Sequence, residues 1–264
     1  MKAKIMLIQP NIFVYGGAER QIVEEANWLT DHNYQVTIMT TEAVQQFKES
    51  LKEAKVFEAG SFENLVNYCR AYCNKFQIYH PHNHPAELFL HPKNAMPNVW
   101  QHNEANEVVL RGGKLDSNEV DAVKSNVTKA VVISDYEKLR FKSVYGFEPI
   151  VNYPGVDYNY FSDTSTPIHD KFGLKDNFVV LECGYITWTK NQLKTVEVFN
   201  EIKKSIPKAK LVLAGYDKDP YSESVKKKIN ELKLDNDVLI TGYLDGDKDI
   251  RDLMRIASLH LLPT

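Results

Sequence analysis

The chain has 264 residues, of which 43% are hydrophobic and 25% are charged, a composition typical of a globular protein with one or two domains. Its formal net charge of −3 excludes a general nucleic-acid binder, because such a protein needs a strongly basic face. No apolar run approaches the length of a membrane-spanning helix. With three cysteines and no signal peptide pattern, the sequence predicts a cytoplasmic protein.

Short apolar runs alternate with amphipathic helical patterns along the whole chain. Such alternation predicts an α/β fold with parallel sheets built from βαβ units. The predicted strands cover residues 5–8, 36–39, 56–57, 78–79, 99–100, 130–133, 150–151, 178–181, 210–214, 238–240 and 259–262. The predicted helices cover residues 18–30, 41–52, 62–75, 117–125, 135–144, 192–205, 222–232 and 248–257.

The first predicted strand leads into a turn that contains Gly16 and Gly17, and a helical pattern follows near Ala18. The first turn of a helix has backbone N–H groups without internal partners, and the helix dipole is positive there. Two glycines let a ligand approach without meeting a Cβ atom. The pattern therefore predicts a binding site for a phosphate or another anion.

The helix after this turn has a clear amphipathic pattern. Helical spacing places its apolar side chains on one face: Ile22, Val23, Ala26 and Leu29. The acidic residues of the same helix, including Glu25, are expected on its other faces.

Three histidines, His80, His82 and His84, follow the fourth predicted strand and resemble a metal-binding His-x-His run. Pro81 and Pro85 favour an irregular loop there, and no acidic residue lies within the run. The prediction is that these histidines hold no metal, and a metal-dependent hydrolase that uses all three is the alternative.

His102 follows the fifth predicted strand. The carboxyl ends of strands are where open α/β sheets bind ligands. His102 is therefore a candidate polar group for a ligand cleft, and a loop histidine with a structural role is the alternative.

The domain boundary is predicted between residues 152 and 153, because Pro154 and Gly155 end the preceding strand. Residues 162–171 are rich in turn-forming side chains and are expected to form a surface link. The chain is thus divided into domains of residues 1–152 and 153–264.

A second strand–turn–helix pattern contains Gly184 and Lys190. Lys190 is a compact cation beside a helix N-terminus, which is suited to neutralising a phosphate, and a solvated surface lysine is the alternative. Two later strands end in a glycine followed by a tyrosine: Gly215-Tyr216 and Gly242-Tyr243. These strand ends predict a ligand site in the second domain.

The remaining charged runs favour surface roles. Asp245, Asp247 and Asp249 have the Asp-x-Asp spacing that can hold Mg²⁺ beside a diphosphate, but turn residues and a helix N-cap explain them better. The lysines at 203–204 and 226–228 are predicted to form solvated helix faces, with weak peripheral membrane contact as the alternative. A G-x-G-x-x-G fingerprint and a Walker lysine are absent, which disfavours a dehydrogenase or an NTPase.

In their order along the chain, these motifs resemble those of the GT-B glycosyltransferases of retaining family 4, the group 1 transferases. The resemblance spans the whole chain, and it depends on the order of the motifs more than on any single one. The matching stretches are Gly16-Gly17-Ala18-Glu19-Arg20, Ile78-Tyr79-His80-Pro81-His82, Val131-Val132-Ile133-Ser134, Tyr153-Pro154-Gly155-Val156-Asp157, Gly184 with Lys190-Asn191, residues 207–215 and residues 238–243.

The resemblance implies two Rossmann-like domains with the active site between them. The C-terminal domain would hold a UDP- or GDP-sugar donor and the N-terminal domain a glycan or lipid-linked acceptor. Transfer would retain the sugar's configuration and need neither a metal nor a cofactor. Many such enzymes build polysaccharides or glycolipids, which places the expected protein in the cytoplasm or at the inner face of the membrane.

The resemblance also assigns residues. His102 would contact the transferred sugar, and Lys190 would bind the diphosphate and stabilise its developing charge. The donor-binding residues it implies are Gly16, Gly17, Gly184, Tyr185, Lys190, Gly215 and Tyr243.

Two departures from the family pattern qualify this reading. Tyr185 stands where the family has an arginine, so a bidentate cation is lost. The Glu-x7-Glu motif is absent from the printed sequence, which reaches Thr264 before that point. The interpretation is a C-terminally truncated glycosyltransferase. A non-catalytic nucleotide-sugar-binding fragment and a nucleotide-sugar epimerase are alternatives.

Overall fold

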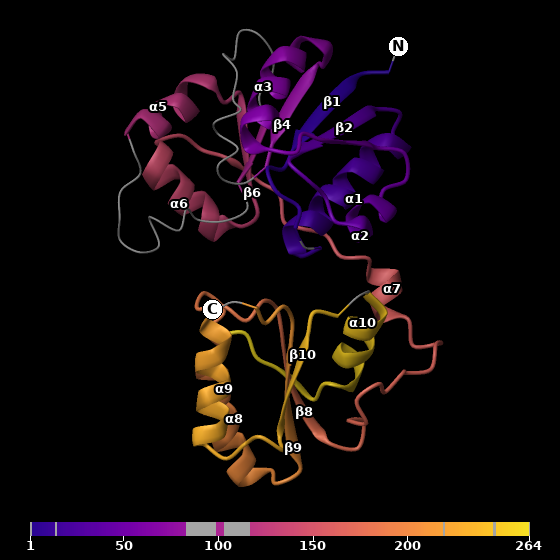
Figure 1. Ribbon diagram of the computed structural model, residues 1–264, viewed down its shortest axis with the longest axis vertical. Helices are drawn as coiled ribbons and strands as arrows, with labels where there is room; N and C mark the ends of the chain where they lie inside the picture. The colour runs from indigo at the N-terminus through magenta and orange to yellow at the C-terminus, as the bar shows by residue number, and fades with distance from the viewer. Residues whose placement is uncertain are drawn as a thin grey trace. The chain divides into compact units, whose positions relative to one another are not determined.

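The strand and helix patterns form two units in the computed structural model, Met1–Gly155 and Val156–Thr264 (Figure 1). The structure describes residues 2–13, 15–82, 99–102, 117–218, 220–244 and 247–263, and of residues 73, 100–102 and 119 it describes the backbone alone. The boundary between the units lies in the same Pro-Gly segment in which the sequence places it.

The first unit contains two parallel sheets, with strand orders β3-β2-β1-β4 and β5-β6-β7, and β5 lies beside β4. Parallel pairing follows from the helices that connect successive strands. The strands are β1 (Lys4–Ile8), β2 (Gln35–Thr40), β3 (Lys55–Glu58), β4 (Ile78–Pro81), β5 (Val99–His102), β6 (Lys129–Val132) and β7 (Ile150–Val151).

Helices cover both faces of the first sheet, because successive strand residues point to opposite sides. Ile5 and Leu7 of β1 pack in a core with α1 and α2, whereas Met6 and Ile8 pack in a core with α3, α5 and α6. The helices are α1 (Gly17–Asp31), α2 (Gln45–Glu49), α3 (Phe62–Tyr72, continued by a 3₁₀ turn at Cys73–Lys75), α5 (Ser117–Asn126) and α6 (Asp135–Tyr145).

The second unit repeats this architecture around a parallel sheet of order β10-β9-β8-β11. Val180 of β8 faces α8 and α9, while Val179 and Leu181 face α10 (Figure 1). The elements are α7 (Tyr158–Ser162), β8 (Phe178–Cys183), α8 (Gln192–Ser205), β9 (Ala209–Ala214), α9 (Tyr221–Glu231), β10 (Val238–Gly242), α10 (Asp247–Ile256) and β11 (Leu259–His260).

The predicted α/β class with parallel sheets is confirmed, and one local prediction is wrong. The helix expected at 41–52 covers only Gln45–Glu49, and the bridge between Ile12 and Ala43 keeps the residues before it extended. A short helix that the sequence did not predict, α7, ends where the expected link begins, and its Tyr160 N–H donates to the Asp157 side chain.

In each unit the strand order reverses beside the first strand, between β1 and β4 and between β8 and β11. Such reversal points open a crevice at the carboxyl ends of the strands, where open α/β sheets bind ligands. The two glycine turns of the sequence follow β1 and β8, so each lies at one of these positions.

Candidate functional site

The loop after β8 is joined to the loop after β9 by backbone hydrogen bonds. The Gly184 N–H donates to the Ala214 carbonyl at 2.9 Å, and the Ile186 N–H donates to the Tyr216 carbonyl at 2.9 Å. The Gln192 side chain, at the start of α8, donates to the Tyr185 carbonyl at 2.9 Å. The loop is therefore held in one conformation by a neighbouring strand end and by the following helix.

Gly215 makes this arrangement possible. A Cβ atom at Gly215 would lie 2.0 Å from the Gly184 carbonyl oxygen, so no other residue fits without moving the backbone. The Gly215 N–H in turn donates to the Gly242 carbonyl at 3.2 Å. The ends of β8, β9 and β10 are thus brought together, as the sequence predicts for a ligand site in this domain.

Lys190 lies directly before α8, with its backbone N–H donating to Thr187 at 3.0 Å. It is half-buried, and the choice between a phosphate-binding lysine and a solvated surface lysine stays a prediction. Asn191 is the N-cap residue of α8, with φ of 57° and no capping hydrogen bond from its side chain, and the first turn contains no acidic residue. A cation and a positive helix end therefore occur together here.

Glu182, the penultimate residue of β8, was missed as a candidate. It is 1% exposed, and neither carboxylate oxygen has a hydrogen-bond partner of good geometry among the described residues. Burial raises the pKa of the Glu182 carboxyl to about 7, although Thr195 and the Lys190 charge act in the opposite direction. The signal in the sequence was a single acid inside an otherwise apolar strand.

Aromatic rings line the same loops. Tyr185 stands where the family motif has an arginine, and its ring lies 5.7 Å from that of Tyr216. Tyr243 follows Gly242, which has a left-handed φ of 68°, and its side chain is exposed. The Asn191 side chain also donates to the Pro263 carbonyl at 3.4 Å, so the segment after β11 reaches the start of α8.

The glycine turn after β1 has different surroundings. Gly16 is the N-cap residue of α1, and its N–H donates to the Glu19 carboxylate at 3.0 Å. A Cβ at Gly17 would meet no atom within 4 Å. Glu19 supplies an intramolecular anion to this helix end, so the predicted role of Gly16 and Gly17 in anion binding stays a prediction.

Two predicted histidines lie partly or wholly outside the described structure. His102 ends β5 with its backbone paired to Val132, and its side chain lies outside the described part of the chain. His84 lies outside the described residues. The roles assigned to them from the sequence stay predictions.

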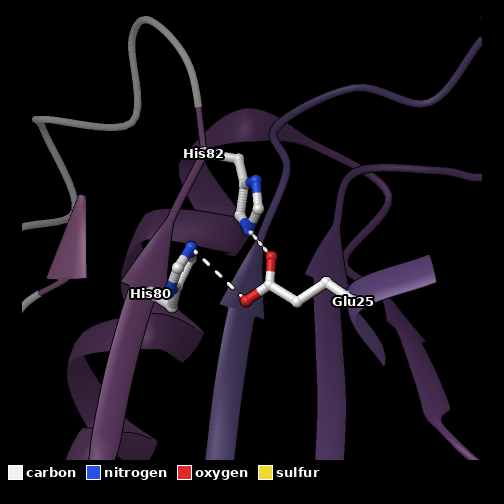
Figure 2. A group of neighbouring side chains, drawn as sticks. All are labelled: Glu25, His80 and His82. Carbon is white, nitrogen blue, oxygen red and sulfur yellow. Dashed lines mark ion pairs between the residues drawn. The ribbon is translucent and has the colours of Figure 1, made fainter. Parts of the chain in front are cut away.

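His80 and His82 are brought together with Glu25, which the sequence placed away from the functional face. Figure 2 shows the Glu25 carboxylate of α1 directed at both imidazole rings. The His80 Nε2 lies 3.7 Å from one carboxylate oxygen and the His82 Nε2 lies 3.5 Å from the other. The expectation that Glu25 points elsewhere is wrong, because it borders the buried stripe formed by Ile22 and Ala26.

The charged runs form surface structure. Asp247 begins α10, and Asp249 pairs with Lys171 at 2.6 Å, while Asp245 lies outside the described residues. Among the basic runs, Lys203 pairs with Asp237 at 2.8 Å. None of the helices in the described residues has the length and apolar character needed to cross a membrane.

Comparisons with known proteins agree with this architecture. Residues 165–264 match the family model of the group 1 glycosyl transferases. No curated protein sequence matches the chain. The family match therefore covers the second unit, which contains Gly184, Lys190 and Gly215.

Solved structures resemble nearly the whole chain at low sequence identity. HepE of Anabaena, in complex with UDP and glucose, has a TM-score of 0.78 at 18% identity, over 98% of this chain and 73% of its own. WaaG, a glycosyltransferase of lipopolysaccharide biosynthesis, has a TM-score of 0.75 at 17% identity, over 98% and 75%. A putative UDP-N-acetylglucosamine 2-epimerase from Listeria monocytogenes has a TM-score of 0.60 at 14% identity, over 98% and 74%. These similarities show that the chain has the GT-B type of fold, with two Rossmann-like domains.

Proposed function

We propose that the chain is a glycosyltransferase whose second unit binds a nucleotide-sugar donor. The observation that supports it most is the loop after β8, where Gly184 is packed against Gly215 and Lys190 precedes Asn191, the N-cap residue of α8. This loop lies in the part of the chain that matches the group 1 glycosyl transferases. A diphosphate suits a cation beside the positive end of a helix.

In this proposal the Lys190 ammonium and the positive end of the α8 dipole bind the donor diphosphate. The same groups stabilise the negative charge that develops on the leaving nucleotide as the glycosidic bond breaks. His102 contacts the transferred sugar. Transfer proceeds with retention of configuration, as in the retaining family 4 enzymes, and the reaction itself uses no metal and no cofactor.

The proposed donor is a UDP-sugar, because HepE was solved with UDP and glucose and the Listeria protein is described as a UDP-sugar enzyme. The proposed acceptor is a glycan or a lipid-linked glycan in polysaccharide assembly, supported by the biosynthetic role of WaaG. Such an acceptor would bring the protein to the inner face of the membrane.

Tyr185 makes the diphosphate site less basic than an arginine would, because its phenol carries no charge at neutral pH. Thr187 and Thr189, whose hydroxyl oxygens are 2.9 Å apart, lie in the same loop and could supplement Lys190. We therefore expect weaker diphosphate binding than in enzymes that have both cations.

The proposal is tested by titrating UDP into the full chain and into two lysine variants by calorimetry. Lys190→Ala removes the proposed phosphate contact, and the loss of one charge-assisted hydrogen bond raises Kd roughly 10- to 100-fold. Lys194→Ala is the matched control, because Lys194 is an exposed lysine of the same helix that pairs with Glu197. Absence of binding by the unmodified chain, or equal Kd values for the two variants, would contradict the proposed site.

Turnover separates the enzyme from a non-catalytic binding fragment. With water alone, UDP-glucose incubated with the protein should hydrolyse slowly to UDP and glucose. With a glycan acceptor present, the glucosyl group should pass from UDP-glucose to an acceptor hydroxyl, with release of UDP. If the protein bound UDP but formed no UDP from UDP-glucose, with or without acceptor, the non-catalytic binding fragment would be supported. Formation of a C2-inverted sugar from UDP-N-acetylglucosamine would instead support the epimerase, which the resemblance to the Listeria protein keeps as the second candidate.

A further inference from the structure

The side chains of Glu25, His80 and His82 converge from two elements of the first unit. His80 and His82 are two residues apart on and just after β4, so they point to the same side of the sheet. His80 is in register with Leu7, whose side chain packs against α1. Glu25 extends from α1 toward the same side (Figure 2).

The spacing of these groups suits a metal ion. One ligand atom from each residue can be chosen so that all three lie within 4.8 Å of one another. Ligand atoms around a tetrahedral zinc ion are separated by about 3.3 Å, given zinc–ligand distances near 2.0 to 2.1 Å. The distances of 3.5 and 3.7 Å from the carboxylate to the two Nε2 atoms therefore need only small side-chain shifts.

Three nitrogen atoms of the two imidazoles have no hydrogen-bond partner among the described residues. His82 is fully buried and His80 is 7% exposed. Within the described part of the chain, neither Nε2 atom makes a hydrogen bond, and neither does the Nδ1 atom of His82. Buried polar atoms in native proteins almost always have a partner, so this set of atoms indicates a ligand.

A direct ion pair explains the cluster less well. Burial lowers the pKa of His80, although the Glu25 charge acts in the opposite direction, and burial lowers the pKa of His82 further. Burial thus disfavours the charged form of both rings. Neutral imidazole and carboxylate are the forms that bind a transition metal.

We propose that Glu25, His80 and His82 form a zinc-binding site that ties α1 to β4, separate from the donor site of the second unit. Two nitrogens and one oxygen suit Zn²⁺ and disfavour Mg²⁺ and Ca²⁺, which prefer all-oxygen sites. The Glu25 side chain is 26% exposed, which leaves an opening for water as a fourth ligand. The ion would link the third turn of α1 to the end of β4.

The sequence alone did not reveal this site, because Glu25 lies far from the histidine run. The signal was the position of Glu25 three residues after Ile22 and four before Leu29, beside the apolar stripe of α1. An acid at such a position is expected to face the sheet edge and needs a partner there.

The test is a zinc titration of the full chain after removal of metal with EDTA, by calorimetry and elemental analysis. The unmodified protein should bind one Zn²⁺ at this site, and Glu25→Gln should weaken that binding by at least about tenfold. Glu24→Gln is the matched control, since Glu24 is the exposed neighbour on the same helix. His82→Asn should also lose the site.

A second measurement does not depend on the folding of variants. Co²⁺ added to the metal-free unmodified protein should give the intense visible absorption of a four-coordinate ion, and Zn²⁺ should displace it. Zinc should also raise the melting temperature of the unmodified chain and of Glu24→Gln, but not that of Glu25→Gln. Absence of the tetrahedral cobalt spectrum, or zinc affinity equal in Glu24→Gln and Glu25→Gln, would overturn the proposal.

Discussion

The glycine turns after β1 and β8 have the same pattern of strand, glycine and helix, yet they differ in charge. At the start of α1, Glu19 accepts a hydrogen bond from Gly16, so the helix end already has an anion within the chain. At the start of α8, no acid occurs in the first turn and Lys190 lies directly before the helix. This difference is why we propose diphosphate binding at the second turn, where a ligand can supply the missing anion.

The two turns also differ in how tightly they are packed. Gly17 has open space where a side chain would begin, whereas the turn after β8 is packed against the end of β9, where a Cβ on Gly215 would lie 2.0 Å from the Gly184 carbonyl oxygen. A glycine can thus permit a ligand to approach or permit two backbones to approach, and the sequence pattern does not separate these roles.

The largest expected effect comes from Gly215→Ala. Its added Cβ would collide with the Gly184 carbonyl oxygen, so the free energy of unfolding of the second unit should fall by at least about 3 kcal/mol. Gly17→Ala is the control, and it should leave stability unchanged or raise it by about 0.5 kcal/mol, because alanine favours the helix. Urea denaturation measures both. If Gly215→Ala and Gly17→Ala lowered the free energy of unfolding equally, the difference in packing between the two turns would be contradicted.

Glu182→Gln should show how the buried Glu182 carboxyl makes the free energy of unfolding depend on pH. The pKa of about 7 in the folded state exceeds the ordinary carboxyl pKa of 4.5, so the folded state holds this proton more tightly than the unfolded chain. The stability that the protonated carboxyl contributes is complete below pH 4.5 and is lost as the pH rises through about 7.

The variant keeps a neutral side chain at every pH. It should match the unmodified protein in acid and exceed it by about 2 to 3 kcal/mol at pH 8. Urea denaturation at a series of pH values measures this difference, with the exposed Glu197→Gln on α8 as control. If the free energies of unfolding of Glu182→Gln and the unmodified protein differed by the same amount at every pH, ionisation of Glu182 would not destabilise the folded state.

Glu19→Ala should have the smallest effect and should act on the first turn alone. Loss of the carboxylate that caps Gly16 should lower the free energy of unfolding by about 1 kcal/mol. The Kd for UDP should stay within about twofold of the unmodified value, because the proposed diphosphate site lies at α8. A large change in Kd would bring the start of α1 into donor binding.

The sequence predicts the order of strands and helices well, because the buried stripes of both units follow simple periods of 2 and 3.6 residues. Thus α8 begins and ends at the predicted residues, Gln192 and Ser205. Prediction from the sequence fails where a contact between residues distant in sequence decides the local structure. The bridge between Ile12 and Ala43 shortens α2, although the residues before it have helical spacing.

Some residues of the two candidate sites could likewise be predicted from local sequence patterns, and others could not. Gly184, Lys190 and Gly215 could be selected because each follows a recognisable strand. Glu25 and Glu182 could not, because the reason for their burial is the surface of another element packed against them. Charges that face a sheet are therefore the residues for which a three-dimensional structure adds most.

The contact between Gly215 and Gly184 also bears on the rates of binding. Two loops joined before the ligand arrives need no rearrangement to receive it, so little ordering entropy opposes association. Encounter would then be governed by diffusion and by attraction of the diphosphate to Lys190, which makes the association rate sensitive to salt. Among variants of this loop, differences in affinity would arise mainly from how long the nucleotide remains bound.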